Sequence, residues 1–451
     1  MIFPFIIQRR ERMFTIGDAY QYDALARNII ENHKFYNSEQ ISYSEPVYKT
    51  LIKGKGMPFD VFRTPVYPLF LAGIYSIFGH KPHLAIIIQI FLSSLACVLV
   101  YKMGEVFINK NIGFIGGLLL ALDFPTAVYA NLLLTETLFL SLFLLSIYLA
   151  LKFFKEKKRV YLGYSSILLG VSTLCRPVVQ YFVILMMLML LISFRKNIKK
   201  GMLNCFLYLL IFLVTLSPWA LRNYITYGSF KLSTIQGHNL LFFNAAYLNS
   251  YQREGGYNYV KNIREELKMK MDKMCVKKDI NSPFEKSKLY QREALKEIFA
   301  HPGIYTKLHF IGIIKMFATP TFPLSERIFG LPLDDSAAMA VGKGFLTKSF
   351  GKALKDFINF FIQNWKALLY LPPLILYLFF LYLVTGYGLY RILKERKSLF
   401  TFSLFLSIII YNALVVGIVG TARFRIPVMP YIDLIGAYGI YRLINLRKEY
   451  V

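Results

Sequence analysis

The chain has 451 residues, of which 56% are hydrophobic and 16% aromatic, and its mean hydropathy is +0.45. A soluble domain is closer to half apolar, so the composition excludes an ordinary soluble enzyme and predicts an all-α polytopic membrane protein. The net charge of +27 would suit nucleic-acid binding, but the lysines and arginines occur in short loops between apolar runs. Loops of this kind set membrane orientation, so we expect no nucleic-acid partner.

The first predicted element is an amphipathic helix that begins at Asp18 and carries Tyr22. A Gly-Asp pair before a helical period is also a helix-start signal, and Asp18 can cap the helix and act in chemistry at once. Residues 2–7 are apolar but too few to cross a bilayer. We therefore expect either that the chain begins on the outer side without a span or, as the favoured alternative, that a first transmembrane helix is missing or truncated.

Apolar runs that predict membrane spans follow along the rest of the chain. They cover residues 83–103, 112–130, 131–151, 161–175, 177–194, 202–219, 368–390, 399–419 and 426–444. The run 161–175 is short for a span and is paired with its neighbour. The sequence therefore predicts about nine or ten transmembrane helices.

Four basic loops, which are predicted to lie on the inner side of the membrane, set the topology. They are residues 152–159, 195–200, 391–397 and 442–448. The spans then alternate, and the outer segments are residues 1–82, 122–131, 176–177, 221–367 and 420–425.

The predicted organisation is one membrane domain over residues 1–445 with a short cytoplasmic tail. Its parts are a first outer loop at 17–82, core spans at 83–220, an outer subdomain at 221–367, C-terminal spans at 368–445 and the tail at 446–451. Two apolar segments inside the outer loops, 67–79 and 305–322, are expected to lie at the membrane interface, the second either there or as a re-entrant segment. The charged stretch 253–297 predicts a solvated helical subdomain.

Eight ionisable residues fall on or just below the predicted outer side. They are Asp18, Arg63, Asp123, Glu136, Arg176, Arg222, Arg423 and Arg425. Charges near lipid are costly, so a face that gathers carboxylates and guanidiniums is a candidate site for a phosphorylated lipid.

Each of these residues also has a structural interpretation. Burying the Glu136 carboxylate in a span costs about 2.5–3.5 kcal/mol, and Arg176 would be a suitable structural partner. A position in the lipid headgroup layer is enough to explain Arg63, and Arg222, which is close to Trp219 in the sequence, fits an interfacial anchor. Arg423 and Arg425 oppose the usual charge bias outside the membrane, which favours a phosphate partner for both.

The sequence shows no pattern for a structural metal site or a nucleotide loop. Its six histidines and four cysteines have no metal-ligand spacing, and three cysteines, Cys97, Cys175 and Cys205, lie in apolar runs. Walker, GxGxxG and nucleophile-elbow motifs are also missing from the sequence.

Six short motifs, taken in order, resemble a known family. They are Gly-Asp-x3-Tyr from Gly17, Arg-Thr-Pro-x-Tyr-Pro-Leu-Phe-Leu from Arg63, Leu-Leu-Thr-Glu-Thr-Leu-Phe around Glu136, Leu-x-Arg-Pro around Arg176, Pro-Trp-x2-Arg-Asn-Tyr from Pro218 and Arg-Phe-Arg-x-Pro-x2-Pro from Arg423. This order resembles the GT-C membrane glycosyltransferases. Within them the chain is most similar to the dolichyl-phosphate-mannose protein mannosyltransferase-like branch, which includes the aminoarabinose transferase of lipid A.

The resemblance implies a GT-C fold and transfer of a sugar from a polyprenyl-phosphate donor, of undecaprenyl or dolichyl type, on the outer face of a bacterial-type plasma membrane. The acceptor is a lipid, glycan or protein hydroxyl, with membrane lipids as further partners. Asp18 matches the family's essential acidic residue and is expected to act as general base, with Glu136 in support. Many relatives carry a further Glu just before the proline that ends the first outer loop, where this chain has Arg63 and Thr64 instead.

The remaining roles follow from the chemistry of the transfer. Arg423 and Arg425, with Arg176, Arg222 and Arg63, are expected to hold the phosphate, and Tyr22 to contact substrate. A single displacement inverts the anomeric centre. A divalent metal is left open as a cofactor. Three alternatives also stay open: a flippase or transporter of polyprenyl-linked glycans, an O-antigen polymerase or ligase-type protein, and an inactive scaffold.

Overall fold

The computed structural model describes residues 18–35, 61–254, 260–319, 351, 355, 358–359, 371–396 and 398–449. Within these ranges the regular elements are helices, which confirms the predicted all-α class. In chain order they are α3 (Asp18–Asn32), α5 (Val66–Phe78), α6 (Pro82–Phe107), α7 (Lys110–Leu122), α8 (Phe124–Ala130), α9 (Glu136–Glu156), α10 (Arg159–Cys175), η2 (Pro177–Val179), α11 (Phe182–Ser193), α12 (Ile198–Tyr227), α13 (Ile235–Asn239), η3 (Leu240–Ala245), α14 (Ala246–Glu254), α15 (Val260–Lys277), α16 (Pro283–Ala300), α17 (Pro302–Ala318), α21 (Leu371–Glu395), α22 (Leu399–Val415), η6 (Ala422–Val428) and α23 (Met429–Glu449).

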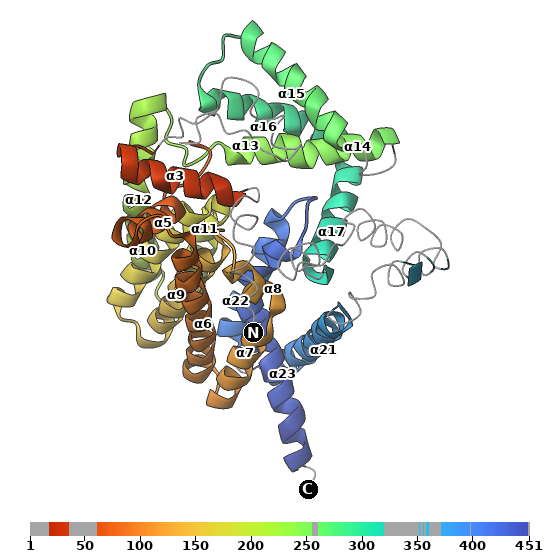
Figure 1. Cartoon of the computed structure of the whole chain (residues 1–451). Helices are drawn as coiled ribbons and strands as arrows, with labels where there is room; N and C mark the ends of the chain where they lie inside the picture. Colours follow the sequence, from red (N-terminus) through yellow and green to blue (C-terminus); the bar gives the residue numbers. More distant parts are fainter. Residues whose placement is uncertain are drawn as a thin grey trace.

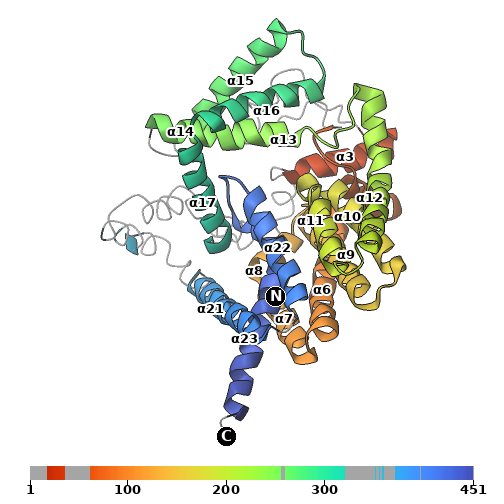
Figure 2. The same ribbon diagram turned by 180° about the vertical axis from the view of Figure 1, so that it is seen from behind.

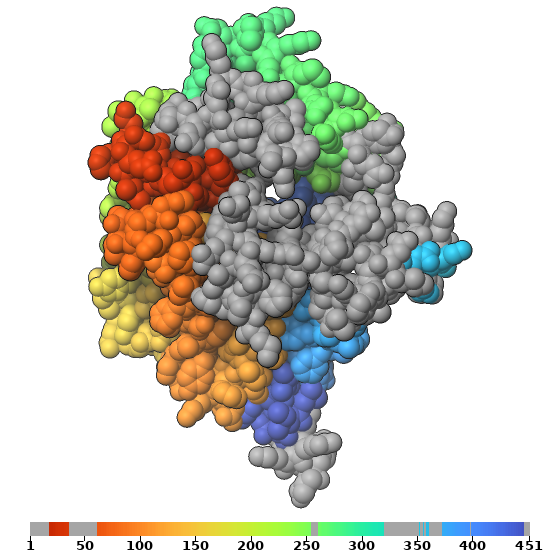
Figure 3. Space-filling model, viewed as in Figure 1, coloured from red at the N-terminus to blue at the C-terminus, as the bar shows by residue number. Residues whose placement is uncertain are grey.

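The helices form a bundle with a second layer across one end. Figures 1 and 2 show α6, α7 and α9–α12 side by side, with α23 against α7, with α21 and α22 packed on α23, and with α13–α16 lying across the far end of the molecule. Helix α17 joins these two parts. In the space-filling view, α3 packs directly on α5 at the same end of the bundle as α13–α16 (Figure 3).

Four helices are long and apolar enough to cross a membrane: α6, α9, α12 and residues 372–395 of α21. The bent pair α7–α8 would make a fifth, while α5, residues 177–193 and α22 are apolar but shorter. These helices identify an integral membrane protein, as predicted. The number of spans stays a prediction, since it depends on how the shorter and bent helices are counted.

Asp123 causes the break in the predicted run 112–130. Its side chain accepts hydrogen bonds from the backbone N and Oγ1 of Thr126, at 3.0 and 2.5 Å, and so caps the start of α8. Pro125 favours a helix start at this point. The chain therefore turns by 60° between α7 and α8 instead of continuing straight.

Glycines allow two helix pairs to approach closely, as is common between membrane helices. A Cβ on Gly104 of α6 would lie 2.2 Å from the Cα of Gly113 in α7, and one on Gly388 of α21 would lie 2.1 Å from the Ile435 oxygen in α23. Both contacts are closer than any side chain permits, so only glycine is compatible with this packing.

The basic loops that were predicted on the inner side meet at one end of the bundle. Lys155 donates to the Val106 oxygen at 2.8 Å, and Lys157 donates to Ser193 Oγ at 2.9 Å. Phe154 contacts Phe400 at the start of α22, with ring centroids 4.8 Å apart. Four chain turns are therefore gathered at this end.

Candidate active site

Asp18, the first residue of α3, is held by two arginines that are distant in sequence. Arg63 donates to one carboxylate oxygen, and Arg423 Nη1 donates to the other at 2.9 Å. Arg63 is itself positioned by α3, since its Nε donates to Gln21 Oε1 at 2.8 Å and its Nη1 to the Tyr22 hydroxyl at 3.2 Å. Burial by itself would raise the pKa of Asp18, but the two guanidiniums outweigh it and hold that pKa well below the ordinary value of 3.8.

Glu136, the first residue of α9, is the second carboxylate of the site. One of its oxygens accepts from Arg176 and from Arg423 Nε, and its side chain is fully buried. Arg423 therefore bridges Asp18 and Glu136. Glu136 lies inside the predicted span 131–151, whereas the structure starts α9 at this residue. Gln89 holds the preceding segment, since it donates to the Leu132 oxygen at 2.6 Å.

The remaining arginine, Arg176, lies at the extended residue between α10 and η2, where Pro177 stops the helix. Thr64 Oγ1 donates to the neighbouring Cys175 oxygen at 3.2 Å, so the segment with Arg63 is attached to the segment with Arg176. Five separate stretches of chain thus converge on one charge cluster. We call it the arginine–carboxylate cluster: Asp18, Arg63, Glu136, Arg176 and Arg423.

Three guanidiniums surround two carboxylates in this cluster, so it carries one net positive charge. Buried ion pairs are costly unless their hydrogen bonds are satisfied, and here each guanidinium has a carboxylate partner. A positive excess on partly exposed arginines suits an anion such as a phosphodiester. The Arg423 side chain keeps 25% of its surface exposed, which leaves it accessible to such an anion.

Two predicted phosphate ligands lie outside this cluster. Arg222 is inside α12, which continues to Tyr227 beyond the predicted end of the core spans at residue 220. Its guanidinium lies 4.9 Å from the Trp219 ring and donates to Asn223 Oδ1 at 3.0 Å, which fits the interfacial-anchor interpretation.

Arg425 is fully buried and points toward the C-terminal end of α17. Its Nη1 donates to the Phe317 oxygen at 2.5 Å and to the Met316 and Thr319 oxygens at 3.4 Å each. A cation at the C-terminus of a helix is favoured by the helix dipole. Arg425 thus holds η6 against α17, and this attachment determines where Arg423, two residues earlier, can reach.

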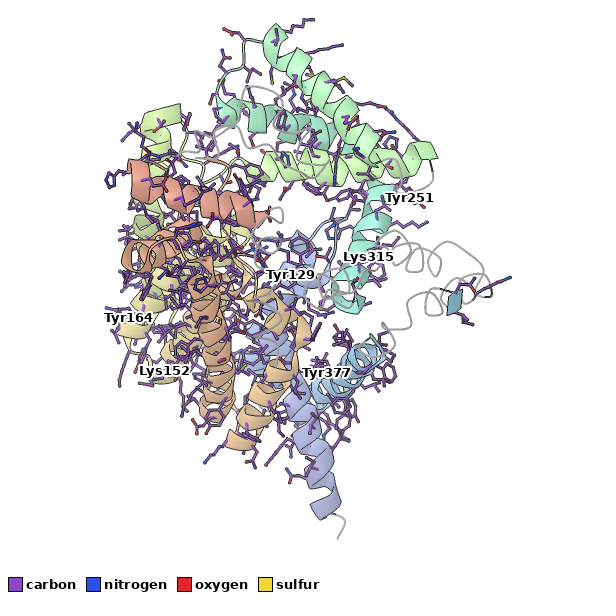
Figure 4. The ribbon with its side chains drawn as sticks, viewed as in Figure 1. Tyr129, Lys152, Tyr164, Tyr251, Lys315 and Tyr377 are labelled. Atoms are coloured by element: carbon purple, nitrogen blue, oxygen red, sulfur yellow. The ribbon has the colours of Figure 1, made fainter. Side chains whose placement is uncertain are left out.

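The sequence analysis did not single out three residues near the cluster. Gln21 holds Arg63, and Tyr129 of α8 has Arg423, Glu136, Arg176 and Asp18 as its electrostatic neighbours. Tyr129 lies in the middle of the molecule, between the α3 and α5 helices and α17 (Figure 4). The third, His238 of α13, stacks edge-on against Phe62, with ring centroids 5.2 Å apart. None of these belongs to a recognisable motif, so their proximity depends on the fold.

The described residues do not offer a donor set for a divalent metal at this site. Among them there is no group of three or more His, Cys, Asp or Glu side chains that could hold an ion. Both oxygens of Asp18 and one oxygen of Glu136 accept from guanidiniums in this structure.

One comparison with known proteins, a family model, agrees with the predicted resemblance over part of the chain. No curated protein matches the sequence. Among solved structures, the archaeal oligosaccharyltransferase AglB from Archaeoglobus fulgidus, in complex with an inhibitory peptide and a dolichol-phosphate, aligns with a TM-score of 0.48 and 13% identity. The alignment covers 96% of this chain, which spans about half of that protein, 47% of its length. Residues 62–221 match the family described as dolichyl-phosphate-mannose-protein mannosyltransferase, which confirms the mannosyltransferase-like resemblance for the segment that carries Arg63, Glu136 and Arg176.

Proposed function

We propose that the protein transfers a sugar from a polyprenyl-phosphate-linked donor to an acceptor hydroxyl, on the outer face of the plasma membrane. The observation that carries this proposal is the position of Arg423, which bridges Asp18 and Glu136 with its guanidinium partly exposed. The family match over residues 62–221 supports the same chemistry. The gathering of basic loops at the opposite end of the bundle supports the outer-face orientation.

The reaction breaks the bond between the anomeric carbon and the phosphate oxygen, and forms a bond from that carbon to the acceptor oxygen. The lipid phosphate leaves with the electron pair and gains one negative charge. Guanidiniums stabilise charge that develops on a leaving phosphate, and Arg423 and Arg63 are placed to do so. The acceptor proton passes to a carboxylate within hydrogen-bond reach, and we assign this role to Asp18.

Asp18 is a weak base while two guanidiniums donate to it, because they favour its ionised form. The donor phosphate is an anion and competes for the same guanidiniums. When Arg63 and Arg423 turn toward the phosphate, Asp18 loses these donors and its basicity rises. Donor binding thereby activates the base, and the acceptor is deprotonated only when the donor is present.

Glu136 has a supporting role in this scheme. Its carboxylate is fully buried and is paired with Arg176, so it keeps Arg423 oriented after Arg423 has left Asp18. A single displacement by the acceptor hydroxyl gives inversion at the anomeric carbon.

The test is transfer of labelled sugar from a polyprenyl-phosphate-sugar pool in membranes that contain the wild-type protein or Asp18→Ala at matched expression. We expect transfer by the wild type with an inverted anomeric configuration in the product, and its loss in the variant with the fold retained. A retained configuration contradicts the single displacement. No transfer by the wild type, together with movement of the intact lipid-linked sugar across the bilayer, supports a transporter instead.

A further inference from the structure

A short π-helix, η3, follows His238 and contacts the loop that leads to Arg423. π-Helices are rare and occur often at functional sites. η3 spans Leu240–Ala245, and the wider turn appears directly in the bond from Ala246 N to the Leu241 oxygen. Asn244 supports it, because its Nδ2 donates to the Asn239 oxygen at 3.1 Å.

On one side, the segment before η3 is attached to the residues that carry Arg63. Thr234 N donates to the Val61 oxygen at 2.9 Å, and Ser233 Oγ donates to the Phe62 oxygen at 2.7 Å. Phe62 then lies between two groups: its ring is 5.0 Å from the Arg63 guanidinium and 5.2 Å from the His238 ring. His238 is therefore one ring away from a guanidinium of the cluster.

On the other side, η3 contacts the loop that leads to Arg423. Asn244 Oδ1 accepts from Ile418 N at 3.2 Å, and a Cβ on Gly417 would lie 2.5 Å from that oxygen. Gly417 has a φ of +70°, a left-handed conformation that favours glycine at this close approach. The π-helix thus contacts the Arg423 segment directly through Asn244, and residues 233–238, which precede it, contact the Arg63 segment.

His238 precedes η3 and is enclosed by aromatic rings. The Phe242 and Phe243 centroids lie 4.9 and 5.9 Å from its ring, and the side chain is 8% exposed. Its Nδ1 has no hydrogen-bond partner among the residues that the structure describes. An unpaired buried polar atom is costly, which points to a ligand that satisfies it. Burial lowers the pKa of His238 to about 4, so the ring is neutral near pH 7 and can exchange hydrogen bonds with hydroxyls.

We propose that His238 binds a hydroxyl of the donor sugar through Nδ1, with the Phe62 and Phe242 rings against the apolar face of that sugar. This proposal rests on the proposed function. The geometric argument is that the sugar is joined to the donor phosphate through one oxygen atom. If Arg63 holds the phosphate, the residues packed around Arg63 are the ones that the sugar meets.

The experiment measures binding without turnover. Purified full-length protein in detergent is titrated with polyprenyl phosphate and, separately, with polyprenyl-phosphate-mannose and polyprenyl-phosphate-glucose. We expect wild type to bind one sugar-bearing lipid more tightly than the sugar-free lipid. His238→Phe keeps an aromatic ring and removes Nδ1. We expect this variant to bind the sugar-bearing lipid about fivefold to tenfold more weakly, as for one lost hydrogen bond. The sugar-free lipid should bind unchanged.

His238→Asn serves as the rescue variant, because an Asn amide places a polar atom near the position of Nδ1, and it should restore most of the lost affinity. His309→Phe is the matched control, since His309 lies on α17, also has an unpaired ring nitrogen, Nε2, and contacts Tyr305 on its own helix. It should not alter binding of either kind of lipid.

The outcomes separate this inference from the function on which it rests. Suppose that binding of the sugar-free lipid depends on Arg423, but that His238→Phe weakens the binding of both lipids equally or of neither. The inference is then overturned and the proposed function stands. If His238→Phe instead raises only the KM for the acceptor in transfer assays, the subsite belongs to the acceptor and the donor-sugar assignment is overturned. If no lipid phosphate binds to the wild type, the proposed function fails first.

Discussion

Arg423 and Asp18 are 405 positions apart in the sequence, and yet a guanidinium nitrogen of one lies 2.9 Å from a carboxylate oxygen of the other. The same guanidinium reaches Glu136 through its Nε. The pair therefore joins the first described helix to the segment before the last one, and it makes Arg423 the residue on which both carboxylates depend.

Replacing Arg423 should affect both stability and activity. Arg423→Gln removes the charge shared by the fully buried Glu136 and the partly buried Asp18, and breaking a buried ion pair by removing one partner costs about 3–5 kcal/mol. We expect a clear fall in the thermal midpoint in detergent and loss of donor binding. The matched control is Arg222→Gln on α12, which should bind donor like the wild type. An equal loss of donor binding in both variants would contradict the bridging role.

Asp18 and Asp23 provide a comparison within one helix. Asp23 also accepts several hydrogen bonds, from Tyr75 at 2.7 Å and from His80 at 2.9 Å, but its partners lie between α3 and α5 and not in the arginine–carboxylate cluster. A general base is worth about 10²–10⁴-fold in rate. We expect Asp18→Asn to lower kcat by at least about 100-fold, whereas Asp23→Asn, which still accepts from Tyr75, changes it by only a few-fold. Similar losses in both variants would mean that α3 is needed for its packing alone.

The stability contributed by Asp18 should depend on pH in a definite direction. Its folded-state pKa is held below the unfolded value, near 3.8, so its contribution is fully present above about pH 4 and is lost as the pH falls through the lower folded pKa. The difference in thermal midpoint between wild type and Asp18→Asn should therefore be constant from pH 7 to pH 5 and shrink below about pH 4. A difference that grows on acidification would show that the arginines do not stabilise the ionised form.

Replacing Arg425 should impair stability but not donor binding, unlike replacing Arg423. Arg425→Met removes the guanidinium that donates to the α17 carbonyls, with no phosphate ligand lost on our assignment. We expect a lower thermal midpoint, with the donor KM of the folded fraction close to that of the wild type. Arg425→Lys, which keeps the charge at the helix end, should recover part of the stability. A raised donor KM at unchanged stability would instead assign Arg425 to the phosphate, as its position in the sequence first suggested.

The sequence by itself determined the helical class, the apolar helices and most of the cluster. Periodicity, apolar length and loop charge are local properties of the sequence. A charged residue in an apolar segment can therefore be recognised without knowledge of the fold. For the same reason Asp18, Arg63, Glu136, Arg176 and Arg423 could be named together, and the structure brings these five into contact.

Only the tertiary structure decided which arginines face the carboxylates. Arg423 and Arg425 have the same local context, but η6 directs one guanidinium to Asp18 and the other to the end of α17. Partners for a guanidinium come from segments hundreds of residues away, and neither charge nor spacing identifies them. The position of His238 beside Phe62 depends in the same way on a π-helix and on hydrogen bonds to backbone oxygens across about 170 residues, for which a single sequence has no local signal.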